Sequence, residues 1–235
     1  MNKNIVLFDL DQTLFDFRLS ESEALSKTLI KFGITPSSEM IDYYSRVNDS
    51  QWKLLEKGLL TREEVLVRRF EIFFEGIGVK ADPLAVRYEY ERNLSQSVIY
   101  IEGAKELLEE LKDIYRLFIV SNGTAKVQNS RIGISGIDKY FEKIFISENI
   151  GYNKPDKRFF DKCFEEIPLI DKENTVIVGD SLSSDILGGK NAGIKTVWYN
   201  PSSAIPDGTI TSDYEITSLD MLPIVLEMIF SKNED

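Results

Sequence analysis

The sequence predicts an α/β protein with an open, doubly wound parallel sheet that is interrupted by an all-helical insertion. Two observations predict this fold class. Five short apolar runs are continuous rather than alternating, which is typical of strands buried on both faces of a parallel sheet. Helical patterns separate the later runs, as in repeated strand–helix–strand units. The expected strands are 5–8, 117–120, 144–146, 176–178 and 196–199.

Three segments between these runs are expected to be helices: 103–112, 155–166 and 182–192. The first carries leucines on one face, and the second opens with Pro155, a residue suited to the first turn of a helix. The third is followed by Gly193, which can adopt the left-handed conformation that ends many helices.

Residues 16–98 contain no strand-like run and are expected to form successive helices. Ser20 to Glu23 and Thr61 to Glu64 have the spacing of capping boxes, which mark helix starts. We therefore predict a core domain made of residues 1–15 and 99–235, and an inserted helical domain made of residues 16–98.

The composition excludes several classes of chemistry. The 235 residues hold 28 Lys and Arg against 39 Asp and Glu, and this acidic balance disfavours a nucleic-acid polymer as partner. The chain has no histidine, which excludes a Ser-His-Asp triad and histidine metal ligands. The single cysteine, Cys163, excludes an internal disulfide and cysteine metal clusters. A bound metal must then be a hard cation held by oxygen, with Mg²⁺ the leading candidate.

The hydropathy of the chain indicates neither a secretory leader nor a membrane anchor. No stretch approaches the roughly 18 apolar residues that a membrane helix needs, and the first apolar run ends at Asp9. We expect a cytoplasmic protein without a membrane partner, either a monomer or a weak homodimer.

Polar residues follow four of the predicted strands. The carboxyl ends of parallel strands share one edge of a sheet, and ligands bind there. Crowded carboxylates at such an edge repel one another unless a cation lies among them. A lysine and a hydroxyl beside the cation can hold phosphate oxygens, and the N–H groups of a turn can face the anion. The residues in these positions are Asp9, Asp11, Ser121, Asn122, Lys154, Asp180 and Asp185.

Without histidine, the simplest nucleophile for phosphoryl transfer is a carboxylate, which would form an aspartyl-phosphate. A second carboxylate two residues along can protonate the leaving oxygen and then activate water. Asp9 and Asp11 have that spacing.

These residues resemble the four motifs of the haloacid dehalogenase-like hydrolase superfamily. The motifs are Asp9-Leu10-Asp11-Gln12-Thr13, then Ser121, then Lys154, then Gly179-Asp180 with Asp185, and they occur in order over about 180 residues. The resemblance implies a Rossmann-like core, and it implies that the helical insertion is the all-helical cap of this superfamily.

The resemblance also implies roles for individual residues. Asp9 would be the nucleophile and a metal ligand, and Asp11 the acid/base, with its backbone carbonyl on the metal. The phosphoryl group would be held by Ser121 and Lys154. Asp180 would bind Mg²⁺, and Asp185 would be a metal ligand or a partner of the ligands. Dehalogenases and phosphonatases lack the second Asp, so Asp11 favours a phosphatase or a phosphomutase.

Further segments resemble the bacterial pyrimidine 5′-nucleotidases of the superfamily. They are Val47-Asn48 with Trp52, the turn 58–61, Arg69-Phe70 and the segment 184–193. Asn48 and Trp52 lie one helical turn apart and share a face. Trp52 could stack on a base and Asn48 could read its edge; equally, Trp52 could pack in the core of the cap. Arg69 is a third candidate for substrate recognition.

The sequence therefore predicts a Mg²⁺-dependent phosphomonoester hydrolase with a small-molecule substrate, in the first place a pyrimidine nucleoside monophosphate. Two alternatives use the same core, namely a sugar-phosphate phosphatase and a phosphomutase. A third is a non-catalytic phosphate-binding regulatory protein. The acid/base carboxylate Asp11 argues against the third, because a protein that only binds phosphate has no need of one.

Overall fold

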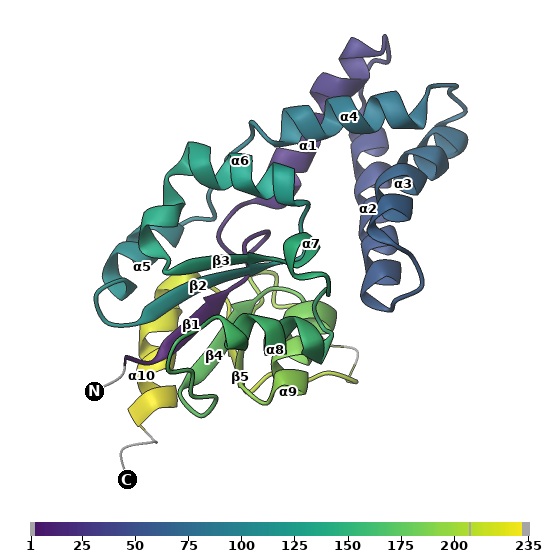
Figure 1. Ribbon diagram of the computed structural model, residues 1–235. Helices are drawn as coiled ribbons and strands as arrows, with labels where there is room; N and C mark the ends of the chain where they lie inside the picture. The colour runs from purple at the N-terminus through teal and green to yellow at the C-terminus, as the bar shows by residue number, and fades with distance from the viewer. Residues whose placement is uncertain (1–2, 207, 232–235) are drawn as a thin grey trace. The chain divides into compact units, whose positions relative to one another are not determined.

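The computed structural model describes residues 3–206 and 208–231 of the chain (Figure 1). The chain divides into two compact units. We call the first the core unit, and it consists of Met1–Asp16, Tyr100–Ala125 and Ser135–Asp235. We call the second the helical unit, and it consists of Phe17–Ile99 and Lys126–Ile134.

The described residues of the core unit form a six-stranded sheet in the order β3-β2-β1-β4-β5-β6, with every neighbouring pair parallel. This arrangement confirms the predicted doubly wound, Rossmann-like sheet. The strand order reverses between β1 and β4, which is the point at which such sheets bind ligands. The strands are β1 (Ile5–Phe8), β2 (Arg116–Ser121), β3 (Lys143–Ile146), β4 (Thr175–Gly179), β5 (Lys195–Tyr199) and β6 (Tyr214–Ile216).

Each of the five predicted runs lies in a strand, and β1 explains why these runs are continuously apolar. β1 lies between β2 and β4, and all four of its residues are buried. Successive side chains point to opposite faces, so both faces of this strand need apolar residues. The sequence analysis missed β6, a three-residue edge strand whose central Glu215 is exposed.

Helices cover both faces of the sheet. Ile5 and Leu7 of β1 pack with α8 (Lys157–Glu165) and with Ala192 of α9 (Leu187–Ala192) in one core cluster. Figure 1 draws α10 (Leu222–Ser231) behind the strands and α8 in front of them. The remaining helices of the core unit are α5 (Ala104–Leu111), α7 (Ser147–Ile150), the short turns η1 (Ile137–Tyr140) and η3 (Leu219–Met221), and the π-helical turn η2 (Leu182–Ile186).

The helical unit contains α1 (Phe17–Lys31), α2 (Ser38–Glu56), α3 (Arg62–Ile77) and α4 (Pro83–Leu94). The predicted capping box at Thr61 and Glu64 begins α3. The one predicted at Ser20 is wrong, because α1 begins three residues earlier and Ser20 is a buried residue within it. Aromatic side chains form the centre of this unit, and Tyr44 contacts the rings of Phe70, Phe73 and Tyr90.

The middle of α6 (Ala125–Ser135) belongs to the helical unit, although it is far from the other helices in sequence. Val127 packs in the apolar core of that unit. Arg131 is fully buried, and its Nε donates to the carbonyl oxygen of Ser97 at 3.0 Å. The helical unit is therefore built from two chain segments, whereas the sequence suggested one.

The longer segment of the helical unit, Phe17–Ile99, leaves and re-enters the core unit at one place. Phe15 and Tyr100 form an antiparallel bridge, and their rings meet edge to face with centroids 5.0 Å apart. The backbone N–H of Ile101 also donates to the carbonyl of Leu14 at 3.0 Å. These contacts close the core unit where the helical segment is inserted. Among the described helices, none is both long and apolar enough to cross a bilayer.

Candidate active site

The candidate site lies at the carboxyl ends of the central strands. Asp9 follows β1, and its backbone N–H donates to the carbonyl of Val178 in β4 at 2.9 Å, so that the residue continues the sheet. Asp180 follows β4, and its backbone carbonyl accepts from the indole Nε1 of Trp198 at 2.8 Å. Both aspartates therefore project from fixed backbone positions.

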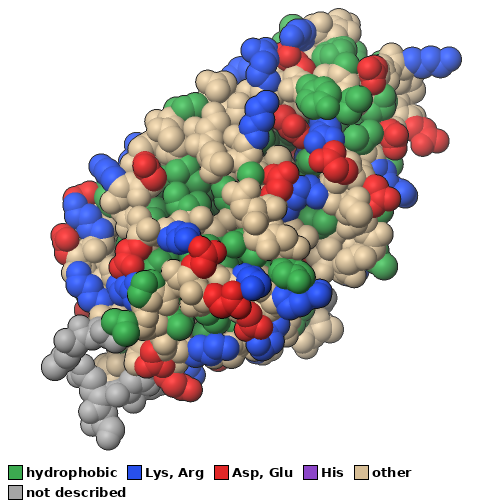
Figure 2. Space-filling view, viewed as in Figure 1, with side chains coloured by type: hydrophobic (Ala, Val, Ile, Leu, Met, Phe, Trp, Pro, Cys, Tyr) green, Lys and Arg blue, Asp and Glu red, His purple; other side chains and the backbone are tan. Residues whose placement is uncertain are grey.

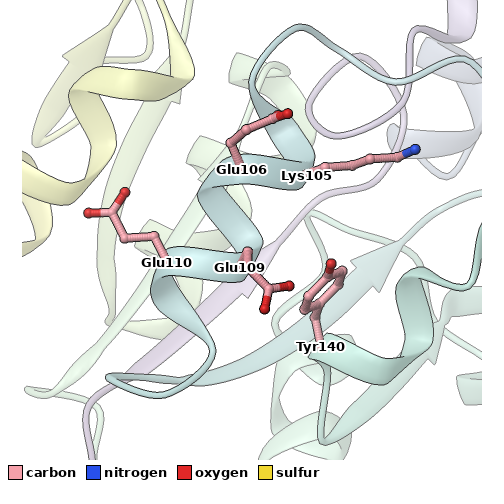
Figure 3. A pocket seen from close by; sticks show the side chains of 5 residues that line it. All are labelled: Lys105, Glu106, Glu109, Glu110 and Tyr140. Atoms are coloured by element: carbon pink, nitrogen blue, oxygen red, sulfur yellow. The ribbon is translucent and has the colours of Figure 1, made fainter.

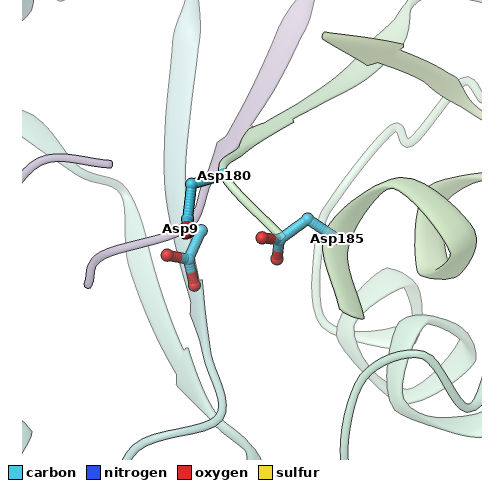
Figure 4. Close-up of side chains that lie close together, drawn as sticks. All are labelled: Asp9, Asp180 and Asp185. Atoms are coloured by element: carbon cyan, nitrogen blue, oxygen red, sulfur yellow. The ribbon is translucent and has the colours of Figure 1, made fainter. Parts of the chain in front are cut away.

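Three carboxylates converge at this edge of the sheet. Asp9, Asp180 and Asp185 each place a carboxylate oxygen within 4.8 Å of the others (Figure 4). Gly179 makes this approach possible, because a Cβ at that position would lie 2.4 Å from Cγ of Asp185. Asp185 is held there by the backbone N–H of Ser181, which donates to its Oδ2 at 3.1 Å. The sequence prediction named these three aspartates, and the structure brings them together.

Lys154 joins this cluster from the loop before α8. Its side chain is 1% exposed, and its ammonium donates to Asp9 Oδ1 at 2.7 Å, to Asp185 Oδ1 at 2.6 Å and to the carbonyl of Val120 at 2.6 Å. These three bonds use every donor of the ammonium group. The buried lysine is thus paired, as a buried charge must be.

Burial and like charge dominate the electrostatics of the cluster. Burial raises the pKa of Asp9 to about 7, helped by the charges of Asp185 and Asp11 and opposed by Lys154. Burial and the charges of Asp9 and Asp185 also raise the pKa of Asp180 well above its ordinary value. Burial acts to lower the pKa of Lys154, but the charges of Asp185 and Asp9 outweigh it and raise the pKa overall.

This donor set fits a divalent cation. Three carboxylates face one ammonium, so the cluster carries an excess of negative charge. All the acidic donors are oxygens, which are the ligands that Mg²⁺ prefers. A cation among them would relieve the repulsion that raises the pKa values of Asp9 and Asp180.

Asp11 is half-buried and lies in the tight loop after β1. The loop is closed by the N–H of Gln12 on the carbonyl of Phe15 at 2.7 Å and by the N–H of Leu14 on the carbonyl of Leu10 at 3.0 Å. The carboxylate of Asp11 is not part of the three-aspartate cluster, but its charge raises the pKa of Asp9. The structure thus separates Asp11 from the carboxylates that surround Lys154.

Ser121 is the last residue of β2, and Asn122 follows it in the turn after this strand. The hydroxyl of Ser121 is buried and accepts from the N–H of Gly123 at 3.1 Å. The amide of Asn122 bonds to the backbone of Lys154 on both sides, and its Nδ2 also donates to Ser184 Oγ at 3.2 Å. Sequence reasoning missed Ser184, because its contact depends on two distant loops that meet only in the fold.

The three candidates in the helical unit form one buried network. Asn48 Oδ1 accepts from Trp52 Nε1 and from a guanidinium nitrogen of Arg69, both at 3.0 Å. Asn48 Nδ2 donates to Glu21 Oε1 at 2.7 Å. Asn48 and Arg69 are buried, and Trp52 is half-buried. Sequence reasoning missed Glu21, whose signal was its place three and four residues before Ala24 and Leu25 on the buried face of α1.

Glu21 is a buried carboxylate, and burial raises its pKa to about 7. The charge of Asp49 raises this pKa further, while hydrogen bonds from Ser45 and Asn48 and the charge of Arg69 oppose the shift. The network therefore contains a group that titrates near neutral pH.

A shallow surface depression lies elsewhere, on α5. Figure 3 shows its lining, which is Lys105, Glu106, Glu109, Glu110 and Tyr140. None of these residues follows a strand, and none belongs to the buried cluster. On the face drawn in Figure 2, acidic and basic side chains are interspersed. The carboxyl ends of the strands remain the place where charged groups converge.

Three carboxylates and a buried lysine thus converge at the carboxyl ends of the central strands of a parallel α/β sheet, an arrangement suited to a hydrolase. The sequence profile described as "Haloacid dehalogenase-like hydrolase" matches residues 6–199. The chain belongs to this family, and it is an enzyme. The resemblance stated from its motifs is confirmed.

Two relatives match the chain over nearly its whole length. The chain is 36% identical over 229 residues to the pyrimidine 5′-nucleotidase PynA of Streptococcus pneumoniae, covering 97% of each protein. It is 30% identical over 220 residues to the pyrimidine 5′-nucleotidase YjjG of Escherichia coli, covering 91% of this chain and 96% of that one.

A solved structure is also similar. The HAD-hydrolase YfnB of Bacillus subtilis, in a crystal form bound to magnesium, is 36% identical to this chain. The two align with a TM-score of 0.91, covering 96% of this chain and 99% of the other.

Proposed function

We propose that the protein is a Mg²⁺-dependent phosphomonoester hydrolase that acts through an aspartyl-phosphate on pyrimidine nucleoside monophosphates. The observation that supports the chemistry is the buried cluster in which Lys154 pairs with Asp9 and Asp185. In this cluster three carboxylates face a single ammonium. The substrate class is supported by two relatives that are named pyrimidine 5′-nucleotidases.

We assign the cation to the three-aspartate cluster. Asp9, Asp180 and Asp185 would hold Mg²⁺ or orient its ligands, with the backbone carbonyl of Asp11 as a further donor. When bound, the ion would neutralise the crowded carboxylates and withdraw charge from a phosphoryl oxygen.

The protein's own residues would carry the reaction in two steps. In the first, a carboxylate oxygen of Asp9 attacks phosphorus, and the ester P–O bond breaks as Asp11 gives a proton to the leaving alkoxide. In the second, Asp11 takes a proton from water, the water oxygen bonds to phosphorus, and inorganic phosphate leaves with Asp9 restored. Each residue is regenerated, so the balance is one water consumed per ester hydrolysed.

Lys154 and Ser121 would hold the transferring group. The ammonium already bonds to Asp9, and a phosphoryl group attached to Asp9 would place its oxygens beside the same ammonium. Contact with a phosphate oxygen would replace one of the three present bonds of Lys154. In the turn after β2, the contribution of Asn122 to anion binding would come from its backbone N–H, because its side-chain amide is bonded to Lys154 and Ser184.

We propose that the helical unit acts as the cap and selects the leaving group. Trp52 would contact the base, since its ring is half-buried and its polar edge is fixed by Asn48. Arg62 lies 5.6 Å from the centroid of that ring and further limits its orientation. Asn48 would then hold Trp52 through its hydrogen bond to the indole, and Arg69 would hold Asn48.

The test is release of inorganic phosphate from a panel of phosphomonoesters, with and without Mg²⁺. The panel contains dUMP, dTMP, UMP, CMP, purine nucleoside monophosphates and sugar phosphates, with Asp9→Asn as the blank. We expect Mg²⁺-dependent release and the highest kcat/KM with pyrimidine nucleotides. A flat profile, or a preference for sugar phosphates, would overturn the substrate class. Absence of release from every ester would overturn the proposed reaction.

A further inference from the structure

We propose that Asn122 is a positioning residue that fixes Lys154, with Ser184 as its support, and that its side chain does not bind the phosphate. The inference rests on the proposed function only for its effect on turnover. The placement of Lys154 is a separate claim about geometry, and it can be tested without any substrate.

The side chain of Asn122 satisfies both backbone polar groups of one residue. Its Oδ1 accepts from the N–H of Lys154 at 2.9 Å, and its Nδ2 donates to the carbonyl of Lys154 at 2.9 Å. The other hydrogen of Nδ2 is directed to Ser184 Oγ at 3.2 Å. The amide therefore ties together the loop after β2, the loop before α8 and the turn η2.

Lys154 needs such a tie because it belongs to no strand. It lies between Ile150, where α7 ends, and Lys157, where α8 begins. In this loop the sheet does not hold the backbone, whereas the ammonium has to meet Asp9, Asp185 and Val120 within hydrogen-bonding distance. Displacement of a catalytic group by about 1 Å can cost roughly a hundredfold in rate.

Residues at the end of β2 bind both the ammonium and the backbone of Lys154. The carbonyl of Val120 accepts from the ammonium, and two residues later Asn122 binds the backbone of the same lysine. The side chain of Lys154 is thus stretched along one short piece of β2 and the turn that follows it. This arrangement fixes the ammonium opposite Asp9, at the end of the neighbouring strand β1.

The same bonds argue against a phosphate contact by the side chain. An amide has two N–H donors, and both donors of Asn122 have acceptors in the protein. Donation to a phosphate oxygen would break the bond to Lys154 or the bond to Ser184. If Asn122 binds phosphate, its effect on kcat/KM should not depend on Lys154. If Asn122 positions Lys154, its effect on kcat/KM should require Lys154.

A double-mutant cycle measures this coupling. We expect Asn122→Ala to lower kcat/KM for a pyrimidine nucleotide by roughly ten- to a hundredfold in the wild-type background. In the Lys154→Ala background the same change should alter kcat/KM by less than about twofold. Equal losses in the two backgrounds would mean that Asn122 contacts the substrate itself. No loss in the wild-type background would likewise overturn the proposal.

A second measurement follows Lys154 directly and uses no substrate. Its ammonium is buried, so acetylation by an amine reagent, read by mass spectrometry, should be slow at this lysine. Asn122→Ala should speed labelling of Lys154 by about tenfold or more, as expected when a positioned group becomes mobile. The matched control is Asn191→Ala, because Asn191 Nδ2 donates to the carbonyl of Pro155 at 3.0 Å in the same loop. Unchanged labelling in Asn122→Ala, or an equal rise in Asn191→Ala, would contradict a specific tie.

Asn122→Asp covers the case in which the alanine variant fails to fold. It keeps the shape and the acceptor for the N–H of Lys154, but it replaces the donor to the carbonyl with an oxygen that repels it. We expect faster labelling of Lys154 with an unchanged melting temperature within about 3 °C. Wild-type labelling in this variant would overturn the role of the Nδ2 bond. If no phosphomonoester is hydrolysed, the proposed function fails while the labelling result still decides this inference.

Discussion

Among the described residues, a buried polar cluster around Lys154 in the core unit and one around Asn48 in the helical unit differ in how completely their charges are matched. In the core unit, Asp9, Asp180 and Asp185 face the single ammonium of Lys154. In the helical unit, Glu21 and Arg69 both bond to one amide, that of Asn48. Buried charges that are paired internally hold a structure together, whereas an excess of one sign calls for a ligand.

The pKa values alone do not separate the two clusters. Burial raises the pKa of Asp9 and that of Glu21 to about 7 in each case. The neighbours differ in their balance: the charges of two carboxylates raise the pKa of Asp9 against Lys154, whereas the charge of Asp49 alone raises that of Glu21 against Arg69 and two hydrogen bonds. A perturbed carboxylate therefore marks a functional site only when the groups around it are left uncompensated.

The largest expected effect comes from removing the nucleophile. Asp9→Asn should reduce phosphate release by at least a thousandfold, since an amide cannot form the aspartyl-phosphate. The fold should persist, because the change also removes charge repulsion from the cluster. Phosphate release and thermal unfolding, measured on the same sample, check both statements. Activity within tenfold of wild type would contradict the covalent mechanism.

The next largest effect is a loss of stability when the cluster around Asn48 in the helical unit is disrupted. Asn48→Ala removes the donor to Glu21 and the acceptor of Arg69, leaving two buried charges with poorer partners. Such losses cost about 2–4 kcal/mol. Urea unfolding measures the change, with Glu23→Gln as a control at an exposed pair with Lys27. A loss as small as that of the control would show that Asn48 is not the centre of the network.

Glu21 gives the network a dependence on pH. Its pKa is about 7 in the folded protein and near 4.5 in the unfolded chain. The folded protein therefore releases this proton at a higher pH than the unfolded chain does. Its contribution to stability is complete below about pH 4.5 and is lost as the pH rises through about 7. The difference in free energy of unfolding between Glu21→Gln and wild type should grow over this range, reaching at most about 3 kcal/mol in favour of the variant. A difference that does not change with pH would contradict the assignment.

The smallest expected effect is that of Mg²⁺ on the free energy of unfolding, and it would show that the cluster around Lys154 binds a cation. At about thirty times the dissociation constant, the ion should add about 2 kcal/mol to the free energy of unfolding. Asp180→Asn should abolish this gain. Glu109→Gln, in the acidic depression on α5, should leave it intact. The measurement is urea unfolding with Mg²⁺ and with a chelator, and an equal gain in Asp180→Asn would place the ion elsewhere.

The fold could be predicted where local pattern and burial agree. β1 and residues 176–178 of β4 are continuously apolar because both strands lie inside a parallel sheet. The short β6 was missed because it is at the edge. Asp9 and Asp180 could be found because the carboxyl ends of neighbouring parallel strands meet at one edge. These features depend on short stretches of sequence and on the geometry of the sheet.

The bonds within the site could not be predicted, because they depend on loops that meet only in the folded protein. The bonds of Asn122 join residues that are 32 and 62 positions apart. The bond between Glu21 and Asn48 spans 27 positions and depends on how α1 and α2 pack. An amide or a carboxylate in a sequence shows its capacity for hydrogen bonds but not its partners.

The divided helical unit has a consequence for recombination between relatives. A chimera that exchanges only residues 17–99 would give Val127 and Arg131 foreign neighbours, because both belong to the segment Lys126–Ile134 of the same unit. Four crossover points, rather than two, are needed to move this unit whole. The third of these points, between Ala125 and Lys126, lies shortly after Asn122. A change of specificity acquired by exchanging the helices would therefore require the segment Lys126–Ile134 to be inherited with them.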